Sequence, residues 1–113
     1  MTAPILTTLA QIQEEHLTWR RRNFPNQTTD QAILGMVEEL GELSHAYLKL
    51  SQGIRGVDRE KAISLIIDAH ADLIIFSFGV AEDLGYDLAE QLWHTWNGVK
   101  QRDWLNHPTT GGE

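Results

Sequence analysis

Carboxylates on two segments of the chain are the side chains whose type and spacing could do chemistry. Glu38, Glu39 and Glu42 stand close together, and Asp68 and Asp72 are four residues apart. On a helix, residues three and four apart lie on neighbouring surface, where like charges repel. Hard cations such as Mg²⁺ prefer carboxylate oxygens, and a bound cation removes the repulsion. The spacing therefore indicates a divalent metal site, with solvated or protonated acids as the alternative.

The neighbours of these acids argue against a surface that is merely solvated. Val37, Leu40 and Leu43 interleave with the glutamates, and the two aspartates lie in the apolar run 66–75. If the apolar residues are buried, some of these acids must border the core, and a buried carboxylate without a partner is costly. Gly41 costs about 1 kcal/mol relative to Ala inside a helix. We expect its small size to admit close approach by another helix.

The rest of the sequence predicts the helices that position the acids. Apolar residues recur at helical spacing, and no segment has the two-residue period of a strand. Cap and stop signals separate the segments: Thr28 with Gln31, Asp58, Gly85 and Asp87. We expect an all-α, four-helix bundle-like fold with helices over residues 4–22, 29–51, 59–84 and 88–104.

Length and composition limit the classes of function. A chain of 113 residues fits one domain, which we expect over residues 1–104, followed by a flexible tail over residues 105–113. The net charge of −7 argues against a nucleic-acid polymer as partner, because such binding needs a cationic surface. There is no cysteine, which excludes disulfides and thiolate metal sites and is compatible with a reducing compartment.

The expected localisation is cytoplasmic. Residues 1–9 lack the basic start and long apolar run of a secretion signal. Residues 62–81 are rich in apolar side chains, but Asp68, His70 and Asp72 near their middle would be expensive in a bilayer. We therefore expect a bundle helix and no membrane partner.

The apolar surface is large for so short a chain. Steps of three and four mark one face of the second expected helix, formed by Ile33, Leu34, Val37, Leu40, Leu43, Ala46, Tyr47 and Leu50. An inner face is expected on the fourth helix at Leu88, Leu92, Trp96 and Val99, with Trp96 in the core. Gly79 could allow close helix packing. A second subunit around a two-fold axis would use this surface, and so would a helical interaction module without catalysis.

The acidic segment and its surroundings resemble a known family. Glu38-Glu39-Leu40-Gly41-Glu42 has the pattern Glu-Glu-x-x-Glu, and residues 35–46 around it are similar to the central helix of the MazG-like, all-α nucleoside triphosphate pyrophosphohydrolases. The resemblance covers residues 5–104. Further residues that carry it are Trp19, Asn23, Phe24, Pro25 and the stretches 68–72, 84–88 and 99–104.

The resemblance implies an activity, a cofactor and a ligand set. The activity is hydrolysis of an NTP or dNTP between the α- and β-phosphates, giving a monophosphate and pyrophosphate, with house-cleaning of the nucleotide pool as the role. The cofactor is Mg²⁺, or Mn²⁺ in its place. Glu39, Glu42 and Asp72 correspond to metal ligands, and Glu38 is the candidate for water activation or further metal contact. Family members are homodimers or homotetramers.

One position departs from the family pattern. The second family motif is usually Glu-x-x-Asp; Asp72 matches its Asp, but Ala69 occupies the Glu position. Asp68, one residue earlier, is the candidate replacement. It lies about 100° around the helix from position 69.

A triphosphate and its base need further contacts. Lys100 and Arg102 are candidate phosphate cations and Asn97 a candidate donor, although cations at a helix end are also favoured by the helix dipole. Trp19 or Phe24 is expected to contact the nucleobase, since a base needs a flat apolar surface. We interpret the Arg run at residues 20–22 as a solvated helix end.

A rival enzyme hypothesis comes from Glu42-Leu43-Ser44-His45. This spells the Glu-x-x-His motif of di-iron carboxylate bundles. Such a site needs a second Glu-x-x-His on another helix, and the sequence has none near Asp68 and Asp72.

Overall fold

The computed structural model describes the backbone of residues 3–112 and the side chains of residues 8–112. Residues 1, 2 and 113, which the expected domain and tail include, lie outside this part. Within it the chain forms four helices and no strand, so the all-α prediction is confirmed. The helices are α1 (Ala3–Asn23), α2 (Thr29–Gln52), α3 (Arg59–Leu84) and α4 (Leu88–Val99).

The predicted cap signals form the helix ends. The Thr28 hydroxyl accepts from the Gln31 N–H, and the Gln31 carboxamide accepts from the Thr28 N–H, which completes the capping box of α2. Asp58 and Asp87 cap α3 and α4 through backbone N–H groups three residues on. Gly85 stops α3 with φ of +79°, a left-handed conformation that glycine adopts without strain.

The fourth helix is shorter than the predicted span to residue 104. It ends at Val99, and the N–H groups of the two residues after Lys100 bond to carbonyls three residues back, which tightens the chain into a 3₁₀-like turn. The Asp103 N–H then donates to the Gly111 carbonyl at 2.8 Å. Residues 102–112 follow hydrogen-bonded turns, and the flexibility expected of the tail stays a prediction.

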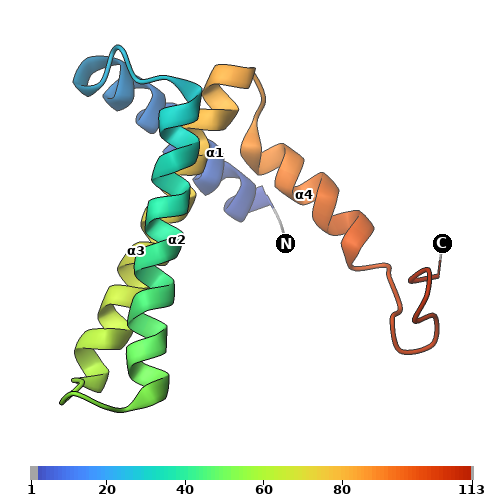
Figure 1. Ribbon diagram of the computed structural model, residues 1–113. Coiled ribbons are helices and arrows are strands. Elements are labelled where there is room, and N and C mark those ends of the chain that lie inside the picture. The colour runs from blue at the N-terminus through green and yellow to red at the C-terminus, as the bar shows by residue number, and fades with distance from the viewer. Residues whose placement is uncertain (1–2, 113) are drawn as a thin grey trace.

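The four helices do not close into a bundle within one chain. Figure 1 shows α2 and α3 as a long antiparallel pair, with α1 across one end and α4 extending away from it. The radius of gyration is 17.6 Å, whereas a compact domain of this length has about 13 Å. The described part of the chain is therefore open, with long helix surfaces that face no other described residues.

The interior is made of small side chains. The buried apolar residues are Ala32, Ala46, Ala62, Ala69, Phe78, Ala81 and Ala89. Most of the large apolar residues expected to form the inner face of α2 point outward instead, with Val37 59% and Leu40 51% exposed, while Leu43 and Leu50 are half-buried. Trp96, expected in the core, is 51% exposed. The reason is that α2 and α3 approach along alanines and glycines, so the bulky residues beside these stripes are left on the outside.

Helix α3 is long and apolar enough, by length and composition, to cross a membrane. A single such helix is weak evidence for a membrane protein, because the core helix of a soluble protein passes the same test. The helix also carries two acids of the candidate metal centre, Asp68 and Asp72.

Candidate metal centre and adjoining cavity

The register of α2 against α3 brings the two acidic segments together. A Cβ on Gly35 would collide with the Phe76 ring, and one on Gly79 would meet the Ala32 Cβ at 3.3 Å. In an antiparallel pair, four residues forward on α2 match about four residues backward on α3. Moving four residues from the contact of Gly35 with Phe76 therefore brings Glu39 level with Asp72.

Three glutamates of α2 form a compact cluster. Ligand oxygens of Glu38, Glu39 and Glu42 all lie within 4.8 Å of one another. Glu39 is only 8% exposed, and its Oε2 is buried without a hydrogen-bond partner. Glu38 and Glu42 are exposed. Between described residues, no ion pair reaches this cluster.

The cluster changes the ionisation of its buried member. Burial raises the pKa of the Glu39 carboxyl, and the neighbouring Glu42, Asp72 and Glu38 carboxylates raise it further. Every charge acting on Glu39 is thus negative. A buried oxygen without a partner, among like charges, is the electrostatic condition that a bound hard cation relieves. The donor set, all carboxylate oxygen, fits Mg²⁺ or Mn²⁺.

The two aspartates of α3 differ in position. Asp72 is half-buried and close enough to Glu39 to affect its pKa. Asp68 is exposed and contributes nothing resolved to that pKa. Ala69, where the family pattern has an acid, is 2% exposed and packed inside the helix pair. The structure therefore brings Asp72 to the glutamates and leaves Asp68 one position off the buried face.

A cavity of about 370 Å³ adjoins the carboxylates through Asp72. It lies between α1, the turn after it and α3, and its lining consists of His16, Trp19, Arg20, Phe24, Gln27, Asp72, Ile75 and Phe76. Trp19 and Phe24 meet edge to face with ring centroids 5.5 Å apart. Both predicted base-contacting residues thus line one cavity, together with Asp72, which acts on the pKa of Glu39.

The run of arginines is not uniformly solvated, so the prediction of a solvated helix end is wrong for Arg20. This residue is 6% exposed, and its guanidinium binds both oxygens of Asp83, at 2.8 and 3.0 Å. It also donates to the Glu82 carboxylate at 3.3 Å and to the Gly79 carbonyl at 3.2 Å. No local sequence signal marks this junction, because Arg20 and its acids are more than sixty residues apart.

The Arg20 junction holds two more polar groups of the cavity wall. Arg20 Nε donates to Gln27 Oε1 at 2.7 Å, and His16 Nδ1 lies 2.8 Å from Glu82 Oε1. Sequence reasoning named neither His16 nor Gln27. Gln27 ends a turn that begins at Phe24, and the Gln27 N–H donates to the Phe24 carbonyl at 3.1 Å. Pro25 at the second position of this turn is the sequence signal that could have located it.

The predicted phosphate contacts lie on α4 or just after its end, apart from the acids. This helix packs on α1, and its carboxyl end points away from the α2–α3 pair (Figure 1). Lys100 Nζ lies 5.2 Å from the centre of the Trp93 ring. Asn97 is half-buried on the same helix, and Arg102 follows its end. A single chain therefore does not bring Lys100, Asn97 and Arg102 to the carboxylates.

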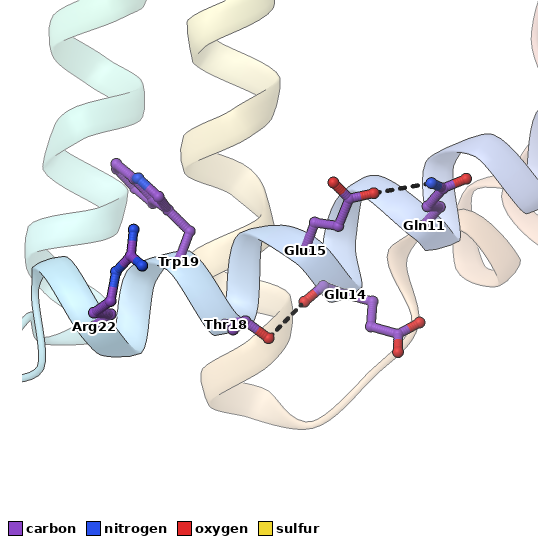
Figure 2. Close-up of a pocket in the computed structure, with 6 residues that line it drawn as sticks. All are labelled: Gln11, Glu14, Glu15, Thr18, Trp19 and Arg22. Atoms are coloured by element: carbon purple, nitrogen blue, oxygen red, sulfur yellow. Dashed lines mark hydrogen bonds between the residues drawn. The ribbon is translucent and has the colours of Figure 1, made fainter.

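A second hollow, of about 540 Å³, has no such chemistry. It is lined by Gln11, Glu14, Glu15, Thr18, Trp19 and Arg22, all on α1. Figure 2 shows that Trp19 rises from α1 on the side of α2 and α3, whereas Glu14 and Thr18 point elsewhere. The polar contacts drawn stay within the helix, such as Gln11 to Glu15 at 2.9 Å. One helix face with no opposite wall is surface rather than a site.

The di-iron alternative gains no support from the geometry. Among described residues, the oxygens and nitrogens close enough to share an ion come from Glu38, Glu39 and Glu42, and His45 is not in that group.

Comparisons of the chain with protein-family models, with curated proteins and with solved structures give no match. The function of the chain has to be inferred from the geometry of its own site.

Proposed function

We propose that the protein is a Mg²⁺-dependent nucleoside triphosphate pyrophosphohydrolase with the MazG-like fold. It adds water across the anhydride between the α- and β-phosphates of an NTP or dNTP, giving a monophosphate and pyrophosphate. The observation that carries the proposal is Asp72. Its carboxylate lies near enough to Glu39 to raise the pKa of that residue, and Asp72 also lines the wall of an aromatic cavity. A metal-binding end next to a base-sized cavity is what a nucleotide requires.

The carboxylates divide the work by burial. Glu39, Glu42 and Asp72 would hold the cation, with Asp68 as the candidate fourth acid. When bound, Mg²⁺ supplies positive charge that offsets the triphosphate. Glu38 is exposed at the edge of the cluster, where its carboxylate can orient a water and take its proton. Trp19 and Phe24 would hold the base in the cavity, with Asp72 at the phosphate end.

A second copy of the chain would complete this enzyme. Lys100, Asn97 and Arg102 are proposed phosphate contacts, and only another subunit's α4 or a movement of α4 would bring them to the acids. The exposed apolar stripe of α2, which includes Val37 and Leu40, gives such a subunit a surface to cover. We therefore propose a homodimer or homotetramer, acting in the cytoplasm in house-cleaning of the nucleotide pool.

The same stripe favours a second candidate function, a helical interaction module without catalysis. The exposed apolar residues would then bind another protein, and the carboxylates would have no substrate. Binding of Mg²⁺ separates the two functions, because only the enzyme needs the cluster loaded.

The test is to incubate the purified protein and Mg²⁺ with a panel of NTPs and dNTPs and to identify the products. Monophosphate plus pyrophosphate is the expected result. Diphosphate plus orthophosphate would exclude the proposed cleavage position. Absence of turnover together with absence of Mg²⁺ binding would favour the interaction module. Glu14→Gln is the control, since Glu14 is an exposed acid of α1 outside the cluster.

A further inference from the structure

The cavity has two chemically different ends. Asp72 marks the acidic end. Gly79 comes seven residues later on α3, about 10 Å along the helix axis. Arg20 connects Gln27 to α3 at the level of Gly79, since its guanidinium donates both to the Gly79 carbonyl at 3.2 Å and to Gln27 Oε1 at 2.7 Å. Gln27 also lines the cavity, and this connection puts it at the end away from Asp72.

The orientation of the Gln27 carboxamide is fixed. A guanidinium can only donate, so the atom facing Arg20 Nε must be the amide oxygen. The amide NH₂ is then turned away from Arg20, and it has no hydrogen-bond partner among the described residues. Arg20 is itself fixed by both oxygens of Asp83. The backbone of Gln27 is held by the turn to Phe24. The NH₂ is thus a donor held in place on a residue that lines this cavity and a smaller neighbouring hollow.

We propose that Gln27 is the specificity-determining residue for the base, and that it selects a keto group over an amino group at the edge opposite the sugar. The inference rests on the proposed function, which directs the phosphates to Asp72 and so points the far edge of the base to Gln27. At that edge, the 4-position of a pyrimidine, thymine and uracil carry a carbonyl acceptor, whereas cytosine carries an amino donor.

The discrimination arises from the unmade bond. A keto oxygen accepts from the Gln27 NH₂. A cytosine amino group would set two donors against each other and form no hydrogen bond with the amide. A site built around one polar contact rejects a ligand that cannot make it. A hydrogen bond that one ligand makes and the other cannot make changes the affinity by about tenfold at most.

The test compares dUMP with dCMP, which share one ring and differ at this edge. Calorimetric titration in Mg²⁺ buffer gives both dissociation constants, and neither ligand has an anhydride to hydrolyse. Wild type is expected to bind dUMP about tenfold more tightly. Gln27→Glu keeps an oxygen for Arg20 and replaces the NH₂ with an acceptor, so it should reverse the preference. Asn26→Asp adds the same charge on the same turn without lining the cavity, and it should leave the preference unchanged.

The outcomes separate this inference from the proposed function. Equal affinities in wild type, no binding of either ligand, or an unchanged preference in Gln27→Glu would overturn the role of Gln27, even if dNTPs are hydrolysed. A reversed preference in a protein that hydrolyses no triphosphate would support Gln27 and overturn the proposed function. Circular dichroism of Gln27→Glu and Asn26→Asp checks that both variants keep the helical fold.

Discussion

Helix α3 carries acidic residues at two places, and the two groups differ in whether a cation of the protein pairs with them. Near its end, Glu82 and Asp83 meet Arg20, and the Glu82 side chain is 2% exposed with a cation on one oxygen and His16 on the other. In its middle, Asp72 lies near Glu39 and raises the pKa of that carboxyl. Buried charges in proteins are normally paired. The first group is therefore complete in the folded chain, whereas the second needs something the chain does not supply.

The ionisation of the two groups reflects this difference. The Arg20 guanidinium lowers the pKa of Asp83, helped by a hydrogen bond from Thr29 and opposed by burial. Burial and three carboxylates raise the pKa of Glu39. The first arrangement stabilises the fold by itself. The second opposes it and is useful only with a cation, which is why we assign structure to one and function to the other.

The largest effect is expected from removing a proposed ligand charge. Glu39→Gln and Asp72→Asn each keep the size of the side chain and should each abolish hydrolysis, because the cation loses a buried carboxylate. Steady-state hydrolysis of the best substrate measures the loss, and circular dichroism should show an unchanged helical fold. Full activity in either variant would refute the ligand assignment.

Breaking the paired group should cost stability. Arg20→Met leaves Glu82 buried without its cation, and such loss of one partner costs about 3 kcal/mol. Urea unfolding measures the difference. Arg21→Met is the matched control, because Arg21 is exposed and surface substitutions change stability by roughly 0.5 kcal/mol or less. Equal effects of the two substitutions would mean that the Arg20 junction adds no net stability.

Loading the unpaired group should add stability. Mg²⁺ at one hundred times its Kd would stabilise the wild type by about 2.7 kcal/mol, seen as a rise in Tm. Glu39→Gln should show little of this rise. Without metal it should be more stable than wild type near neutral pH, since it lacks the buried charge. A wild type that is indifferent to Mg²⁺ would leave the cluster without a metal role.

The smallest effects are in the pH dependence of metal-free stability, and they have opposite signs. The lowered pKa of Asp83 gives stability above the ordinary Asp value of about 3.9, which is lost as pH falls through the lowered pKa. The raised pKa of Glu39 gives stability below the ordinary Glu value of about 4.3, which is lost as pH rises through the raised pKa. Asp83→Asn should reduce the loss of stability as pH falls below the ordinary Asp value. Glu39→Gln should reduce the loss of stability as pH rises above the ordinary Glu value. The measurement is Tm as a function of pH in the presence of a chelator. A variant whose curve keeps the wild-type slope in its pH range would contradict the prediction for that residue.

Local signals in the sequence predicted the helices well. Thr28 with Gln31, Asp58 and Gly85 act through backbone groups a few residues away, so their effect can be derived from spacing alone. The outward face of α2 could not be derived in this way. Helical spacing shows that Val37 and Leu40 share a face, but only the packing of small residues decides that this face is left outside.

The candidate site divides along the same line. The closeness of Glu38, Glu39 and Glu42 is set by helix geometry, and the sequence predicted it. The burial of Glu39 and the exposure of Asp68 depend on how α3 is rotated against α2, which spacing does not fix. Arg20 and Gln27 depend on contacts across the fold. The sequence of three consecutive arginines does not indicate which of them makes such contacts.

The register set by Gly35 and Phe76 has a consequence for the order of folding. The carboxylate cluster needs only α2, α3 and the short loop between them, whereas the cavity needs Arg20 to meet Asp83 far along the chain. Contacts between segments close in sequence form sooner. We expect amide hydrogens of the α2–α3 pair to become protected first in pulsed hydrogen exchange during refolding, and those of α1 later. The chain would then assemble its mutually repelling acids before it gains the ion pairs that offset their cost.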